Sequence, residues 1–287
     1  MSKVGIIGYG ITPFTKKDQK IESVLLDSAK QLFRNNSQIN REDIDAVLVS
    51  TNNNSKYLSP ILSEMTGIQP KISHSVESLC NSGTNSLVSA YSYIASGLAN
   101  MVLVTGAERY DSPGQILQWD NSRGEFKHPI FWASIFTKSY KREFSISDEQ
   151  LAIVSVKNHK QAKENPNALS NKTYTVDDVM NSKKLTEDLR LLDCSRPCTG
   201  SASIIMASEE KAIKTYYKLL GFNELVTEAN SMVVEISNKE MNDDLAMRSK
   251  NIIKELKSRS SKINPILADV FSQISQNLEK NISLLTN

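Results

Sequence analysis

The stretch from Ser75 to Gly97, SVESLCNSGTNSLVSAYSYIASG, constrains the fold of this chain more than any other. A lone cysteine, Cys80, follows a short alternating segment that suits a strand, and an Asn-Ser-Gly-Thr break comes directly after it. The helix expected next carries mostly small side chains on several faces, which lets other backbones approach it closely. We therefore expect a buried helix, not an amphipathic one, that ends at Gly97.

The position of Cys80 at the start of a helix favours a nucleophilic role. Unpaired backbone N–H groups at a helix start carry partial positive charge and stabilise a thiolate, the reactive form of cysteine. The side chains of Asn81, Ser82 and Gly83 add little bulk that would block an incoming thioester. An inert buried cysteine is the alternative that spacing alone leaves open.

Strand and helix patterns alternate through the first hundred residues. Short apolar runs at Val4–Gly8, Asp43–Ser50 and Met101–Gly106 are typical of buried strands, and helical spacing marks Glu22–Phe33 and Ser59–Thr66. This alternation predicts an α/β fold with a largely parallel sheet and helices on both faces.

The glycines of GIIGYG invite a second interpretation, a nicotinamide-dinucleotide fold. Gly8 and Gly10 follow a strand pattern, but the third glycine of the dinucleotide motif is absent at the right spacing and Pro13 follows soon after. We disfavour this interpretation, and a cofactor-binding titration tests it.

Composition indicates the cellular compartment and the kinds of partner that we expect. The net charge of +2 gives no indication of nucleic-acid binding, and the 3 cysteines of the 287 residues are typical of a reducing compartment. No apolar run is long enough for a signal peptide or a membrane span. We expect a soluble cytoplasmic protein with no membrane partner.

Residues 111–190 interrupt the alternation with long polar stretches and one predicted helix, Ser147–Lys163. A long excursion between strands is usually functional. Basic side chains here (Lys157, Lys160 and Arg190) are candidates for phosphate contacts or simply a solvated face.

The histidines give no clear catalytic base. His74 lies on the strand before Cys80, and His128 is expected to line the pocket with Phe131 and Trp132 or to support a loop. For His159 a supporting role in a loop is at least as well favoured, and we do not assign it a catalytic role.

Two further cysteines precede the next strand, Ser201–Ser208. Cys194 and Cys198 are separated by three residues, a spacing that invites a metal site. Without partner histidines we favour two reduced structural thiols and expect no metal.

Three segments together resemble the thiolase superfamily. LCNSGTNSLVSAYSYIASG with MVLVTGAERYD resembles its nucleophile region, and EQLAIVSVKNHKQAKENPNA and TVDDVMNSKKLTEDLRLLDCS resemble its loop region and the return to the core. The branch that these segments resemble most is the sterol-carrier-type and archaeal acetyl-CoA acetyltransferases, over about residues 1–208.

The resemblance implies a specific organisation. Residues 1–208 would form a thiolase-like N-terminal half with a mostly parallel mixed sheet, and the inserted loop domain at about 111–190 would cover the active site and hold coenzyme A. Cys80 would carry the acyl group, with an acyl-CoA as substrate and no other cofactor. The resemblance also implies a role in lipid metabolism and a dimer. The chain departs from the family pattern beside Gly200, where Cys198 and Thr199 stand in place of an acidic residue that relatives usually carry.

Residues 209–287 do not look like the second half of such an enzyme, because they contain no histidine and no cysteine. Their patterns predict helices at Glu240–Lys257 and from Asn264 onward, and a short strand at Met232–Ile236. Apolar residues from Leu267 to Leu285 form a coiled-coil-like seam.

Two functions therefore stay open. The chain is either an acyl-CoA acyltransferase of thiolase type, acylated on Cys80 and incomplete without a second catalytic half, or a non-catalytic subunit that binds acyl-CoA or a full-length thiolase. The uncovered side of the Cys80 helix would be met by the helical tail or by another chain, as a homodimer or a mixed complex, unless the gene is disrupted. Since no base for carbon–carbon bond chemistry is identified, we expect the isolated chain to be a poor thiolase.

Overall fold

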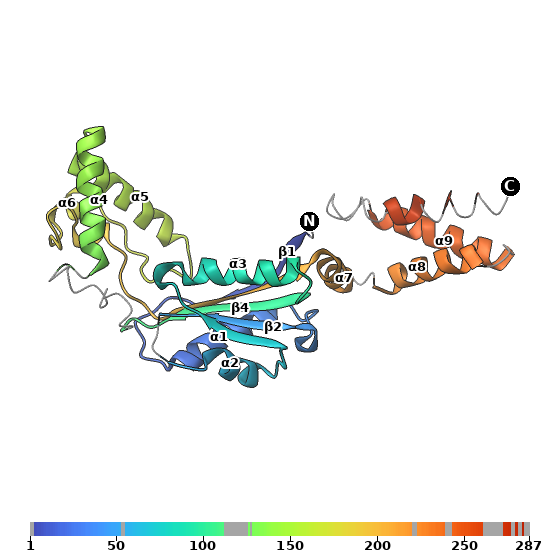
Figure 1. Cartoon of the computed structure of the whole chain (residues 1–287). Helices are drawn as coiled ribbons and strands as arrows, with labels where there is room; N and C mark the ends of the chain where they lie inside the picture. Colours follow the sequence, from blue (N-terminus) through green and yellow to red (C-terminus); the bar gives the residue numbers. More distant parts are fainter. Residues whose placement is uncertain are drawn as a thin grey trace. The chain divides into compact units, whose positions relative to one another are not determined.

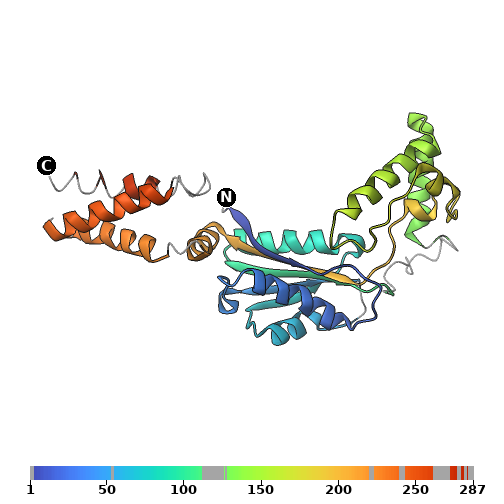
Figure 2. The same cartoon turned by 180° about the vertical axis from the view of Figure 1, so that it is seen from behind.

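The computed structural model describes residues 3–52, 55–111, 126, 128–219, 223–238, 243–260, 272–276, 279–280 and 283. The chain divides into two compact units, Met1–Ala212 and Ile213–Asn287. Figures 1 and 2 show a sheet with helices against it in the first unit and helices alone in the second.

The first unit is built on a five-stranded sheet in the order β1-β5-β4-β2-β3. Its strands are β1 (Val4–Ile11), β2 (Ala46–Ser50), β3 (Ile72–Val76), β4 (Met101–Glu108) and β5 (Gly200–Ser208). β2 pairs in parallel with β3 and β4, whereas β5 pairs antiparallel with β1 and β4. Four strands thus run in one direction and β5 alone in the other, which confirms the mostly parallel mixed sheet.

Helices cover both faces of this sheet, as predicted (Figure 1). They are α1 (Ile21–Asn35) and α2 (Leu58–Thr66) on one face and α3 (Ser82–Ala95) on the other. The alternation along β2 explains the division, because successive strand residues point to opposite faces. Val47 and Val49 join the core under α1 and α2, whereas Ala46 and Leu48 join the core under α3.

Gly10 shows what the glycines of GIIGYG do. They lie within β1, and not in a turn between a strand and a helix. A Cβ at Gly10 would stand 2.3 Å from the carbonyl oxygen of Ser28 and 2.5 Å from the amide nitrogen of Leu32, both backbone atoms of α1. The glycine therefore allows α1 to pack directly on the strand, a role in packing and not in phosphate binding.

Helix α3 differs from the prediction of a helix buried on several faces. One face is buried against the sheet through Ser82, Ser86, Ala90 and Ile94. The opposite face is open, with Val88 57% and Tyr91 44% exposed. The small side chains on the inner face permit close packing on β2 and β4, but within the first unit nothing in the described residues covers the outer face.

The region between β4 and β5 contains α4 (Pro129–Phe144), α5 (Asp148–Lys163) and α6 (Val176–Asn181). The predicted helix Ser147–Lys163 is confirmed as α5. Ser147 caps it, since its hydroxyl accepts from the amide of Gln150 while the Gln150 side chain accepts from the amide of Ser147.

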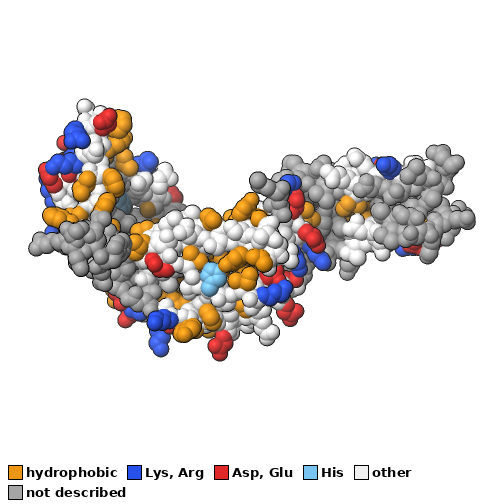
Figure 3. All heavy atoms as spheres, viewed as in Figure 1, with side chains coloured by type: hydrophobic (Ala, Val, Ile, Leu, Met, Phe, Trp, Pro, Cys, Tyr) orange, Lys and Arg blue, Asp and Glu red, His pale blue; other side chains and the backbone are white. Residues whose placement is uncertain are grey.

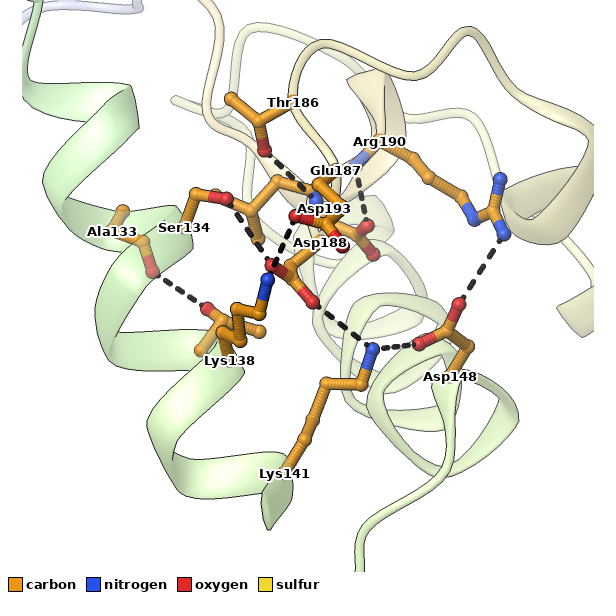
Figure 4. Close-up of polar contacts among 12 residues, drawn as sticks. Ala133, Ser134, Lys138, Lys141, Asp148, Thr186, Glu187, Asp188, Arg190 and Asp193 are labelled. Carbon is orange, nitrogen blue, oxygen red and sulfur yellow. Dashed lines mark hydrogen bonds and ion pairs between the residues drawn. The ribbon is translucent and has the colours of Figure 1, made fainter. Parts of the chain in front are cut away.

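Charged side chains connect α4 to α5 and to the segment before β5 (Figure 4). Lys141 Nζ lies 2.5 Å from Asp148 Oδ1 and 3.3 Å from Asp188 Oδ1. Arg190 Nη2 lies 3.5 Å from Asp148 Oδ2, and Lys138 forms an ion pair with Glu187 farther out. The polar face of α4 therefore points into this region.

The opposite face of α4 is apolar and exposed. Large side chains recur along it at every third or fourth position: Trp132, Ile135, Phe136, Tyr140 and Phe144. Phe136 is 66% exposed and Phe144 60%. Apolar side chains on the surface of this region and above the sheet are visible in Figure 3.

The second unit contains α8 (Asn223–Asn238) and α9 (Asp243–Ser260), and α7 (Glu209–Leu219) spans the division between the units. The short strand predicted at Met232–Ile236 is wrong, because these residues belong to α8. Leu225, Ala229 and Met232 are buried at helical spacing, so the helical period prevails over the local β-branched residues.

The rest of the tail is only partly described. Helix α9 confirms the helix predicted at Glu240–Lys257, whereas the predicted start at Asn264 and most of the seam from Leu267 to Leu285 lie outside the described residues. Among the helices that the structure describes, none combines the length and the apolar character needed to cross a membrane.

Candidate active site

Cys80 lies in a tight turn between β3 and α3. The turn is a single 3₁₀ segment, Leu79–Asn81, and α3 begins at the next residue. Ser82 anchors it, because its Oγ accepts from the amide of Ser78 at 2.8 Å and donates to the carbonyl of Leu79 at 2.7 Å. The Cys80 thiol is free and exposed, so Cys80 is not a buried cysteine.

The residue before the cysteine has an unusual backbone. Leu79 has a φ of +50°, a left-handed conformation that costs a bulky residue about 1–3 kcal/mol. The Glu77 carboxylate accepts from the amide of Leu79 at 2.7 Å and helps to maintain this conformation. Such a strained turn presents the next side chain, Cys80, to solvent.

Cys80 faces an open cavity of about 1170 Å³ at the carboxyl ends of β2 and β4. Its walls come from these two strand ends, from the turn at Cys80, from the start of α4 and from the segment 189–202. Ligands of α/β proteins commonly bind at this edge of the sheet, where polar side chains converge beyond the strand ends.

All three cysteines of the chain line this cavity. Cys194 and Cys198 are free thiols, and burial raises the pKa of both, with the charge of Asp193 adding to the effect at Cys194. Burial therefore favours the neutral thiol over the thiolate at both positions. In the part of the chain that the structure describes, no group of histidine, cysteine and acidic side chains is placed to hold a metal ion.

The spacing of the three thiols gave no sign of this convergence. Cys80 and Cys194 are far apart in the sequence, and only the return of the chain to β5 places the second and third cysteines beside the first.

Of the three histidines, one reaches the cavity. His128 lines it and caps α4, with Nδ1 accepting from the amide of Ile130 at 3.2 Å. His74 Nε2 lies 2.8 Å from the hydroxyl of Tyr93 on α3, and neither residue lines the cavity.

Other predicted pocket residues lie elsewhere. The prediction that Phe131 and Trp132 line the pocket with His128 is wrong, because the rings of Phe131 and Trp132 contact Phe126 and Phe136 respectively. These two residues extend from other sides of α4 than the one that meets the cavity. His159 packs edge-on against the ring of Tyr174.

The basic residues predicted as phosphate contacts differ in their exposure. Arg190 is held by Asp148 and is mostly buried, whereas Lys157 and Lys160 are exposed on α5. Two other arginines, Arg109 and Arg196, line the cavity and were missed. Phosphate contacts by Lys157, Lys160 or Arg190 stay predictions.

Glu108, at the end of β4, is the acidic residue that the sequence patterns failed to single out. It lines the cavity together with Cys80. Its Oε1 accepts from the hydroxyl of Thr51 at 3.0 Å and from the amide of Asn52, both at the end of β2. An acidic residue closing the apolar run MVLVTGAE was the available signal.

Comparison with known proteins decides the family. Residues 4–200 match the family described as Thiolase, N-terminal domain. The chain belongs to the thiolase family. The matched range includes the whole loop region and ends at the first residue of β5, so every wall of the cavity lies within or directly beside this thiolase N-terminal domain.

Two relatives show which proteins this chain is similar to in sequence. It is 28% identical to an acetyl-CoA acetyltransferase of Methanocaldococcus jannaschii, over 90% of this chain and 66% of that protein. It is 25% identical to sterol carrier protein 2 of Oryctolagus cuniculus, over 88% of this chain and 48% of that protein. The chain thus spans less than two thirds of their length, and both alignments extend beyond the family match into the helical region.

A solved structure shares the fold. The Ltp2-ChsH2(DUF35) aldolase superposes with a TM-score of 0.64 at 23% identity, over 73% of this chain and 56% of that chain. At this identity the similarity shows a shared fold alone.

Proposed function

We propose that this thiolase-family chain accepts an acyl group from an acyl-CoA onto Cys80. The Sγ thiolate attacks the thioester carbonyl carbon, the bond from that carbon to the sulfur of coenzyme A breaks, and the released thiolate takes a proton from water. Backbone N–H groups at the start of α3 stabilise the oxyanion of the tetrahedral intermediate. The reaction is of the acetyl-CoA C-acetyltransferase kind.

The observation that carries this proposal is the place of Cys80. It is an exposed thiol in a strained turn, at the start of a helix and on the wall of a cavity large enough for the reactive end of an acyl-CoA. The names of the relatives support acetyl-CoA as the donor.

The chain offers two matched controls, since Cys194 and Cys198 face the same cavity. We would incubate the purified chain with acetyl-CoA and measure its intact mass and the hydroxylamine sensitivity of any added group, which marks a thioester. We expect one acetyl increment that is lost in Cys80→Ala and retained in Cys194→Ala and Cys198→Ala. Retention of the increment in Cys80→Ala would overturn the proposal.

A second candidate function is a thiolase-like subunit without activity of its own. The observation that favours it is the open outer face of α3, where Val88 and Tyr91 are exposed. On this view the chain binds a second copy of itself or another thiolase-like chain. Light scattering of the chain alone and after co-expression with a thiolase from the same source tests it, and a strict monomer in both samples would exclude it.

The domain limits complete the proposal. We assign residues 1–208 to the thiolase-like domain, with about 111–190 as its inserted loop domain, and residues 209–287 to a separate helical segment. Limited proteolysis that yields a stable fragment ending near residue 208 is the expected result.

A further inference from the structure

Glu108, one of two acidic residues in the described part of the chain that line the cavity, has one carboxylate oxygen without a hydrogen bond. Both hydrogen bonds that Glu108 receives, from Thr51 Oγ1 and from the amide of Asn52, go to Oε1. Its other oxygen, Oε2, accepts no hydrogen bond from any residue in the described part of the chain. The carboxylate is half-buried, so its orientation is maintained by β2 while Oε2 is free for a ligand.

The other proton acceptors of the first unit are less suited to a base in this cavity. His74 and His159 contact tyrosine rings and do not line it. Asp193 also lines it and has one hydrogen-bonded oxygen, Oδ2, which accepts from the amide of Arg190 at 2.8 Å, so it is the rival carboxylate that the variants below must separate from Glu108. His128 uses Nδ1 to cap α4.

We propose that Glu108 is a catalytic base that removes a proton from the carbon next to the thioester carbonyl of a bound acyl-CoA. This inference rests on the proposed function of Cys80. The proton moves to Glu108 Oε2, and the electron pair of the broken C–H bond stays on the acyl-CoA as an enolate. The enolate carbon then attacks the carbonyl carbon of the acyl group on Cys80. A carbon–carbon bond forms, the bond from the acyl carbon to Sγ breaks, and the Cys80 thiolate leaves and is reprotonated from Glu108.

Glu108→Gln is a sharp test because it is nearly isosteric. The amide oxygen of glutamine can accept the same two hydrogen bonds from Thr51 and Asn52, so the anchor is retained and only the basic Oε2 is lost. Asp193→Asn is the matched control, since it removes another carboxylate from the same cavity. A circular dichroism melt of each variant confirms that it is folded.

The readout is exchange of the acetyl-CoA methyl protons with D₂O, followed by NMR on the full chain, with Cys80 acetylation measured in parallel by intact mass. We expect exchange in the wild-type chain, a loss of about 10²-fold or more in Glu108→Gln and little loss in Asp193→Asn. Glu108→Asp, which retains a shortened base, should recover part of the rate. Because the substitution also removes a charge from the cavity of Cys80, the exchange rate of each variant is expressed per acetylated chain.

The outcomes separate the two proposals. If Cys80 is not acetylated in the wild-type chain, the proposed function fails first. Normal acetylation without any methyl exchange in the wild type, or with equal exchange in wild type and Glu108→Gln, would overturn the role of Glu108 alone. In the latter case loss of exchange in His128→Asn would assign the base to the histidine.

Discussion

Helices α1 and α4 have similar lengths and opposite orientations of their apolar faces. In α1 the apolar residues point toward the sheet, and Leu25, Ala29 and Leu32 are almost completely buried. In α4 the large apolar residues point outward, and the polar side faces α5 and the segment before β5. The same residue types thus stabilise one helix and leave the other with an exposed apolar surface.

The difference shows which forces position the two parts of the candidate site. The sheet and α1 are held by apolar burial, at about 1.5–3 kcal/mol for each fully buried large side chain. The loop region depends on hydrogen-bonded ion pairs. Each contributes up to about 3 kcal/mol to the stability of the fold, and this contribution changes with pH. The strand ends that carry Glu108 are therefore held by apolar burial, whereas the cavity wall contributed by α4 is held by interactions that change with pH.

The largest expected effect comes from truncating the two apolar faces in turn. Leu32→Ala should lower the free energy of unfolding by about 2–5 kcal/mol, because it leaves a cavity in a fully buried site. Phe136→Ala should change it by less than about 0.5 kcal/mol, since that side chain is 66% exposed. Urea titrations measure both, and equal losses would contradict the comparison.

A smaller effect is expected from the lysines of α4. Lys141→Met should lower local stability by about 1–3 kcal/mol, because it leaves Asp188, whose side chain is 8% exposed, without its cation. Lys138→Met is the control, since Lys138 and Glu187 are largely exposed, and no measurable change is expected. Amide hydrogen exchange along α4 and α5 distinguishes the two; similar protection in both variants would show that the ion pairs are not what holds α4.

The smallest effect is the acid response of the same network. The hydrogen bond from Lys141 holds the pKa of Asp148 below its ordinary value of 3.8, and the bond to Asp148 raises the pKa of Lys141 above 10.5. Because its pKa is lowered in the folded state, the Asp148 carboxylate stabilises the fold at pH values above its ordinary pKa. This stabilisation is lost as the pH falls through the pKa of the folded state. Because the pKa of Lys141 is raised, this lysine stabilises the fold at pH values below 10.5, and that stabilisation is lost as the pH rises further.

We therefore expect protection of α4 amides to fall relative to α1 below about pH 4. Hydrogen exchange corrected for the intrinsic pH dependence measures this, and Asp148→Asn should abolish the difference. A parallel fall in both helices would instead indicate global acid unfolding.

Much of the fold was predictable because short-range patterns determine it. The apolar runs of β1, β2 and β4, the spacing in α1 and the cap of α5 each depend on neighbouring residues in the chain. The strand predicted at Met232–Ile236 was wrong because a five-residue window with three β-branched residues cannot show that Leu225 and Ala229 continue the same helical face. The expectation that α3 is buried on several faces was wrong, because small side chains permit close packing on several sides without requiring it.

The candidate site divides in the same way. The turn at Cys80 is encoded locally, since a strand, a cysteine, small residues and a helix in that order form a local unit. Long-range pairing instead brings Glu108, Cys194 and Cys198 to its cavity and leaves Phe131 and Trp132 outside it. The reason is physical: adjacent strand ends and the returning segment are brought together by pairing between β2, β4 and β5, which are distant in the chain and leave no local periodic signal.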